Sequence, residues 1–116
     1  MENSILKTVK QAIGPSATYS FFEPDIIMHV NTTFMILTQM GVGPAEGFSI
    51  TDESATWSDF ISDINKMEGV KTYVCQKARL FFDPPTSSIL MEALKQSITE
   101  LEWRLNWQSE STTKNE

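Results

Sequence analysis

Two consecutive prolines, Pro84 and Pro85, restrict the fold of this chain more than any other feature. A proline lacks a backbone N–H and its ring clashes with the preceding helical turn, so neither residue can lie inside a helix. On both sides of this break, apolar residues recur at steps of three or four, which is the spacing of one helix face. These residues are Met67, Val70, Val74, Ala78 and Phe81 before the break, and Leu90, Leu94, Ile98, Leu101 and Leu105 after it. The sequence therefore predicts a long antiparallel helical hairpin in which the two apolar stripes face each other.

The chain before the hairpin predicts three shorter helices and one long loop. Helix-capping and helix-breaking residues flank apolar runs over residues 5–13, 25–40 and 57–63. Residues 41–55, which carry three glycines and a proline, separate the last two of these helices. Apolar and polar residues alternate over positions 48–51, but no second strand of comparable quality follows, so we expect an ordered loop. The predicted fold is all-α: a small bundle of about five helices built on the C-terminal hairpin.

Length and composition indicate a single domain. The chain has 116 residues, 41% of them hydrophobic, which is enough for a substantial core. We place the domain at residues 1–107 and expect residues 108–116 to be a disordered tail, because their polar side chains cannot bury enough surface to offset chain entropy. The single cysteine, Cys75, excludes an internal disulfide and favours a reducing compartment such as the cytoplasm. No segment has the apolar length of a signal peptide or a membrane span, so we expect no membrane contact.

No group of residues indicates an active site, a cofactor site or a metal site. His29 is the only histidine and lies at the edge of a predicted core stripe, where a packed imidazole is expected. Cys75 also falls near a core face, which favours a packed thiol over a nucleophile. Gly41 and Gly43 lack the later glycine and the lysine of a phosphate-binding loop. We therefore expect no enzyme activity.

The charge balance bears on nucleic-acid binding. Nine basic and fifteen acidic residues give a net charge of -6, which argues against a surface that holds DNA by neutralising phosphates. The helix predicted over 57–63 and the helix after it resemble a helix-turn-helix, but the second helix is too apolar to be a recognition helix. An acidic surface can still face a duplex that slides past it. Equally, it can be a solvated surface that keeps the protein soluble.

Two helix faces carry large apolar residues on the side opposite the predicted core. Met28 and Met35 lie on such a face of the second helix, and Trp103 and Trp107 lie on such a face of the last helix. Tryptophan is enriched at interface hot spots and methionine packs adaptably, so we interpret these four residues as parts of a protein interface. The alternative is that the N-terminal helix and residues 19–22 cover the tryptophans within the same chain.

The loop over residues 41–55 is a second candidate for partner contact. Long ordered loops in compact domains are commonly functional. Gly43 and Phe48 are its candidate interface residues.

Several short motifs, taken in their order and spacing, resemble those of one protein family. They are GVGP at 41–44, TWSDF at 56–60, VKTY at 70–73, LFFDPPTSS at 80–88 and ELEWRLN at 100–106. Together they are similar to the small head-tail connector, or head completion, proteins of tailed bacteriophages and prophages. The similarity extends from about Asp25 to Asn106, although none of the motifs alone contains chemistry that only one function requires.

The resemblance implies a structural function. A protein of this family would join a ring beneath the portal and continue the DNA channel toward the tail. Its partners would be further copies of itself, the portal protein, the next head-completion or tail protein and, without sequence specificity, the DNA in the channel. It would be assembled in the bacterial cytoplasm and reside at the head-tail junction of the virion. The alternative is a small helical adaptor or regulator that binds a host protein through the same tryptophan and methionine faces.

Overall fold

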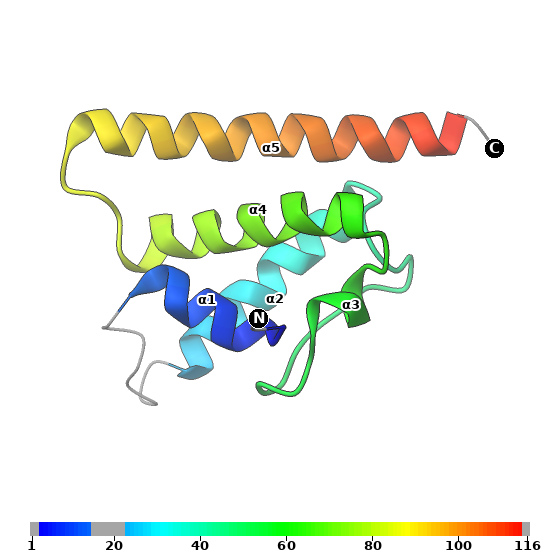
Figure 1. Ribbon diagram of the computed structural model, residues 1–116, viewed down its shortest axis with the longest axis horizontal. Coiled ribbons are helices and arrows are strands. Elements are labelled where there is room, and N and C mark those ends of the chain that lie inside the picture. Colours follow the sequence, from blue (N-terminus) through cyan, green and yellow to red (C-terminus); the bar gives the residue numbers. More distant parts are fainter. Residues whose placement is uncertain (1–2, 15–22, 115–116) are drawn as a thin grey trace.

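The computed structural model describes residues 3–14 and 23–114, with the backbone alone for residues 108–114, and contains five helices within them. They are α1 (Ile5–Ile13), α2 (Glu23–Gln39), α3 (Trp57–Phe60), α4 (Ile64–Phe82) and α5 (Ser88–Lys114). Among these residues the only strand-like pairing is an isolated bridge between Ser4 and Thr56, so the predicted all-α fold is confirmed. α4 is the central layer: α5 lies antiparallel along one side of it, and α1 and α2 pack on the other (Figure 1).

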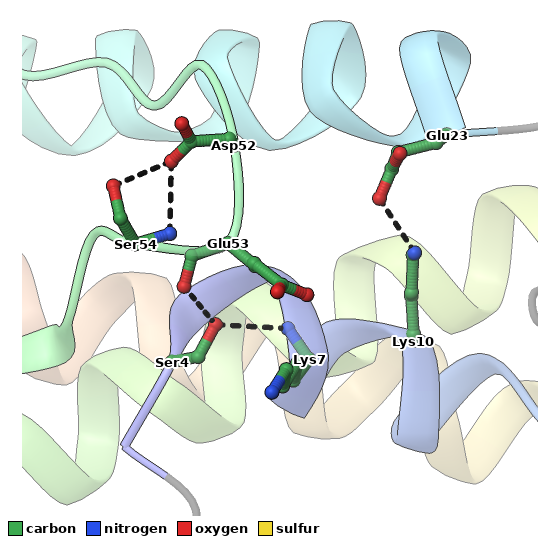
Figure 2. A network of polar contacts seen from close by, with 7 residues as sticks. All are labelled: Ser4, Lys7, Lys10, Glu23, Asp52, Glu53 and Ser54. Carbon is green, nitrogen blue, oxygen red and sulfur yellow. Dashed lines mark hydrogen bonds and ion pairs between the residues drawn. The ribbon is translucent and has the colours of Figure 1, made fainter. Parts of the chain in front are cut away.

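The start of α1 is held by residues far away in the sequence. Ser4 caps the helix by accepting a hydrogen bond from the N–H of Lys7 at 3.3 Å, and its hydroxyl donates to the carbonyl of Glu53 at 2.8 Å (Figure 2). One turn before the end of the helix, Lys10 forms an ion pair with Glu23 at 2.6 Å, also visible in Figure 2. An isolated nine-residue helix is marginal in water, so these contacts and its buried apolar face stabilise α1.

α2 buries one face of the helix, and a glycine follows its C-terminal end. The buried residues are Ile26, Val30, Thr33, Phe34 and Leu37. Gly41 follows the helix with a φ of +86°, a left-handed conformation that glycine adopts without strain. Its N–H donates to the carbonyl of Thr38 at 3.0 Å, and the N–H of Val42 donates to the carbonyl of Leu37 at 2.9 Å. These bonds satisfy carbonyls that the helix leaves open, so Gly41 closes α2 in the way a C-terminal glycine commonly does.

The long loop after α2 is ordered by one amide side chain and by aromatic packing. Asn31 of α2 donates from its side chain to the carbonyl of Ile50 at 3.0 Å and accepts from the N–H of Ile50 at 2.7 Å. These two hydrogen bonds satisfy the backbone of Ile50 in the way that a neighbouring strand would. Phe48 packs edge-on against Phe34 and Phe60, with ring centroids 5.1 and 5.2 Å apart. The prediction of an ordered loop is confirmed.

α3 and α4 both begin at capping residues, one of which differs from the predicted one. At α3 the carboxylate of Asp59 accepts from the N–H of Thr56 at 2.9 Å, as the capping-box pattern predicts, but the helix ends at Phe60 after one turn. α4 begins at Asp63, whose carboxylate accepts from the N–H of Asn65 at 2.9 Å. The sequence predicts a cap at Asn65. Asp63 takes this role because the early end of α3 frees its side chain, and a carboxylate suits the positive end of a helix.

α4 contributes more to the core than any other part of the hairpin. Its fully buried residues are Val70, Tyr73, Val74 and Ala78. The predicted stripe is therefore confirmed over most of its length. α1 and α2 cover one side of this helix and α5 covers the other, so α4 is poorly placed to enter a DNA groove as a recognition helix.

The register of the hairpin explains why Leu90 is exposed, although the sequence predicts it in the core. Three contacts between α4 and α5 define this register. Gly69 packs beside Leu105, the Tyr73 hydroxyl donates to the Glu102 carboxylate at 2.7 Å, and the Ser97 hydroxyl donates to the Gln76 side chain at 2.9 Å. Continued toward the hinge, the register places Leu90 opposite residue 84, beyond Phe82 at the end of α4. No part of α4 is left to cover Leu90 there, so its predicted core position is wrong.

Phe81 also differs from its predicted position. Its side chain is 68% exposed, whereas the periodicity predicts it on the inner stripe of the hairpin. Its ring stacks on His29 of α2, with centroids 4.8 Å apart and planes at 18°, and also lies edge-on to the Phe82 ring, with centroids 4.9 Å apart. The periodic pattern gives the correct helix, but the last turn of α4 extends past the residues that would enclose Phe81.

α5 continues beyond the predicted end of the domain. The helix reaches Lys114, whereas the sequence predicts an end at residue 107. Residues 108–114 contain neither glycine nor proline, so nothing in this segment interrupts a helical backbone. The division into a domain over 1–107 and a tail over 108–116 stays a prediction. Within the described ranges, no helix is long and apolar enough to cross a membrane.

Candidate protein interface

The four residues predicted on the outer helix faces are all exposed. Their exposed fractions are 69% for Met28, 52% for Met35, 64% for Trp103 and 56% for Trp107. The two methionines are two turns apart on α2, and the two tryptophans are one turn apart on α5. The outward direction predicted from helix geometry is confirmed, whereas the role of these residues in an interface stays a prediction.

The tryptophans of α5 are not covered by the N-terminal helix. α1 packs on α4 and α2, on the opposite side of α4 from α5 (Figure 1). Residues 19–22, which the sequence offers as a second cover, lie outside the described residues. On α5 the described side chains that are buried are Ile98 and Leu105, and most of the others over residues 88–107 are exposed and open to a partner.

A shallow groove of about 450 Å³ lies between the C-terminal half of α2 and α5, and we call it the Trp103 groove. Its lining residues are Ile36, Gln39, Met40, Thr99, Glu102, Trp103 and Asn106. Trp103 therefore stands at the edge of a depression shared by two helices. A partner side chain that entered it would contact both helices at once.

A second groove of about 670 Å³ lies at the start of α2, and we call it the Met28 groove. Its lining residues are Glu23, Pro24, Ile27, Met28, Asn31, Ile50 and Thr51. The hydrogen bonds between Asn31 and Ile50 join its two walls, one from α2 and one from the loop. The groove is therefore a fixed feature of the surface rather than a gap between independent segments.

His29 lies where α2 meets the end of α4, at the edge of the core as predicted. Its ring stacks on Phe81 and meets the edge of Phe82, with ring centroids 5.5 Å apart in the second case. Burial lowers the pKa of the imidazole below its ordinary value of 6.5; a hydrogen bond with the Lys77 backbone raises it in part, and the Lys77 charge lowers it. The buried Nε2 has no hydrogen-bond partner among the described residues. These surroundings favour a neutral, packed histidine.

The Cys75 thiol and the Tyr73 hydroxyl also have shifted pKa values. Burial raises the pKa of the Cys75 thiol to about 11, which keeps it protonated and unreactive at neutral pH. Burial and the hydrogen bond to Glu102 raise the pKa of Tyr73 well above its ordinary value. Both side chains therefore act as packing groups. The part of the chain that the structure describes contains no cluster of three His, Cys, Asp or Glu residues able to hold a metal ion.

Comparison with known proteins identifies the family. A family model described as "Phage connector protein" matches residues 5–112, nearly the whole chain. The chain belongs to the phage connector family. The head-tail connector resemblance predicted from the short motifs is thereby confirmed, and the protein is a structural connector of a phage. No curated protein and no solved structure matches the chain.

Membership implies that the connector oligomerises and contacts other phage head or tail proteins. The family is structural and non-catalytic. Partner-binding surfaces are therefore the functional sites to seek in this connector, and the two exposed helix faces and their grooves are candidates of that kind.

Two predicted interface residues in the loop of the connector already have a packing role. Phe48 is half-buried in the aromatic cluster around Phe34. Gly43 lies so close to α3 that a Cβ atom added there would stand 2.4 Å from the Phe60 ring. Packing within the chain is enough to explain why a glycine stands at 43 and a phenylalanine at 48. The role of these two residues in an interface stays a prediction.

A third exposed apolar region of the connector lies at the hinge between α4 and α5. It comprises Phe81, Ile89 and Leu90, of which the sequence predicts Phe81 and Leu90 in the core. Periodicity assigns Phe81 and Leu90 to the core because it describes each helix separately. Both residues lie within a few positions of the two prolines in the sequence. The helical turns next to such a break have fewer neighbours than turns in the middle of a helix, and this is the sequence signal that could have predicted their exposure.

Proposed function

We propose that this connector is one protomer of a ring that docks beneath the portal and continues the DNA channel toward the tail. The observation that supports it most directly is the presence of two exposed apolar faces on different helices of one chain. A ring requires one patch to meet a different patch on the next copy, so that repeated rotation closes the assembly. Members of this family oligomerise, so the two faces can form the two sides of the contact between neighbouring protomers.

In the proposed ring, Trp103 and Trp107 of one protomer pack against Met28 and Met35 of the next. Rigid aromatic rings and adaptable thioethers pack well together. A tryptophan buries roughly 150–250 Å² in such contacts, which is a large share of a small interface. The loop that carries Gly43 and Phe48 is a second contact region, with the portal or the next head-completion or tail protein as its partner.

Such an interface is modest in area, which affects how the ring forms. Association costs translational and rotational freedom, and a small apolar contact exceeds that cost only when several copies are held together. We therefore expect free connector to be monomeric in the bacterial cytoplasm and to assemble on the portal. The assembled ring would then remain at the head-tail junction of the virion.

The net charge of -6 fits a channel wall that DNA passes without being held. A wall that repels phosphates cannot trap the duplex by counterion release, which is the main source of non-specific affinity. The DNA contact in this proposal is therefore transient and independent of sequence.

Ring assembly on portal-containing heads, scored by electron microscopy, tests the proposal. We expect wild-type connector and a Leu90→Ala control to assemble, because Leu90 is exposed at the hinge end of α5, about three and a half turns from Trp103. Trp103→Ala and Trp107→Ala, combined in one folded variant, should abolish the ring. Normal rings and normal tail recruitment by this variant would place the contacts elsewhere. Absence of wild-type protein from virions would favour the host-binding adaptor instead.

A further inference from the structure

Trp107 and Met28 each have an exposed charged residue three positions earlier on the same helix. Arg104 precedes Trp107 on α5, and Asp25 precedes Met28 on α2. All four side chains are exposed. Residues three apart lie on the same helix face, so each helix presents an apolar group and a charge side by side. Arg104 and Asp25 carry opposite charges, and each stands at the same spacing from its apolar neighbour.

One of these two places is beside an apolar groove, and the other carries a large exposed apolar ring. Met28 borders the Met28 groove, whose other walls include the apolar side chains of Pro24, Ile27 and Ile50. Trp103 borders a groove of its own chain, so it is partly engaged there. Trp107 lies one turn further along α5, is more than half exposed and lines neither of the two grooves, so its ring can enter a groove on another molecule.

We propose that Trp107 of one connector enters the Met28 groove of the neighbouring copy, with Arg104 facing Asp25 across the interface. This register rests on the proposed ring function and specifies its lateral contact. The same chain cannot supply both halves, because the start of α2 lies on the far side of α4 from the C-terminal part of α5 (Figure 1). A contact between different patches of identical chains is the kind that closes into a ring.

Arg104 is free to exchange its present partner for Asp25. It pairs with Glu100 on its own helix at 2.8 Å, and both side chains are more than half exposed. Exposed pairs of this kind contribute little to stability, so replacing one by an interfacial pair has little energetic cost. Opposite charges at the edge of an apolar contact fix its register and exclude alternatives in which like charges meet.

Charge reversal tests the register. Arg104→Glu, Asp25→Arg and the double variant are assembled on portal-containing heads, with Asp83→Arg as a control that makes the same charge change as Asp25→Arg at the exposed hinge between α4 and α5. Each single reversal places like charges opposite each other, and we expect a roughly tenfold or greater fall in the fraction of heads that carry a ring. The double variant should recover most of the wild-type fraction, and Asp83→Arg should have no effect. Circular dichroism verifies that each variant is folded.

Two results would overturn the register: normal assembly by both single variants, or a double variant as defective as the singles. Both are distinct from failure of the ring itself, which the Trp103→Ala and Trp107→Ala variant reports. A second measurement uses Met28→Cys combined with Trp107→Cys on assembled heads. We expect oxidation to give a ladder of disulfide-linked oligomers, absent when either new cysteine is present alone; the buried Cys75 is common to all samples. Absence of the ladder from heads that electron microscopy shows to carry a ring of the double-cysteine variant would also overturn the register.

Discussion

Gly43 occupies a position where a side chain does not fit. Its φ is +85°, and a Cβ atom would stand 2.4 Å from the Phe60 ring, well inside contact distance. Gly47, four residues later in the same loop, has a φ of +97° but nothing within 4 Å of the equivalent Cβ position. The two glycines thus share a backbone conformation and differ in the space around it.

Alanine substitutions at Gly43 and Gly47 distinguish the energetic cost of backbone strain from the cost of steric overlap. We expect Gly47→Ala to lower the free energy of unfolding by about 1 kcal/mol, the cost of a left-handed backbone with a side chain. Gly43→Ala adds displacement of the Phe60 ring from a packed cluster and should cost roughly 2–4 kcal/mol in total. Urea unfolding of both variants measures the difference. Equal losses would show that the ring of Phe60 moves aside without cost.

The lowered pKa of His29 makes stability depend on pH. The unfolded side chain titrates near 6.5 and the folded one lower, so the unfolded state binds more protons as the pH falls through this range. The free energy of unfolding therefore decreases from about pH 7.5 downward until the pH passes the folded pKa. Since His29 is the only histidine, His29→Gln should flatten this part of the profile in urea unfolding. Parallel profiles for wild type and variant would contradict a buried neutral imidazole.

At the scale of elements, capping chemistry predicts helix ends better than periodicity predicts burial. Ser4 and Gly41 mark the observed ends of α1 and α2, because a cap or a left-handed glycine acts within one turn. Phe81 and Leu90 are misassigned because burial depends on the length and register of the neighbouring helix. That information lies in pairs of residues across the hairpin, such as Tyr73 with Glu102, and in no single periodic pattern.

The Asn31 side chain connects the long loop to α2 through two hydrogen bonds. Asn31→Ala removes both hydrogen bonds to the Ile50 backbone, so we expect faster amide hydrogen exchange at Ile50 through local opening. Thr32→Ala is the matched control, because the Thr32 hydroxyl bonds only to the Met28 carbonyl of its own helix among the described contacts. Unchanged exchange at Ile50 in Asn31→Ala would mean that aromatic packing alone holds the loop.

For the whole molecule, the exposure of the candidate interface was predictable and its shape was not. Helix geometry places Met28 and Trp103 outward because their core stripes are unambiguous. The Met28 groove needs Ile50, which reaches it through a loop whose path no local pattern specifies. Likewise, the Trp103 groove depends on the separation between α2 and α5, two helices that are distant in sequence.

The end of α5 offers a test at the scale of the molecule. Residues 108–116 are all polar or charged, so we expect their removal to change the free energy of unfolding by no more than about 0.5 kcal/mol. Truncation after Glu102 is the control, because it also removes the buried Leu105 that packs beside Gly69, and it should destabilise the domain strongly. Thermal melting compares the three chains. A large loss from the shorter truncation would move the domain boundary beyond 107.

The position of α1 against α4 has a consequence for the order of events at the ribosome. α1 packs on α4, and Ser4 bonds to Glu53, 49 residues later in the chain. Synthesis proceeds at roughly 5–20 residues per second, so the first helix leaves the exit tunnel seconds before the surface that buries it exists. The nascent N-terminal segment must therefore wait with its apolar face uncovered until the central helix has emerged.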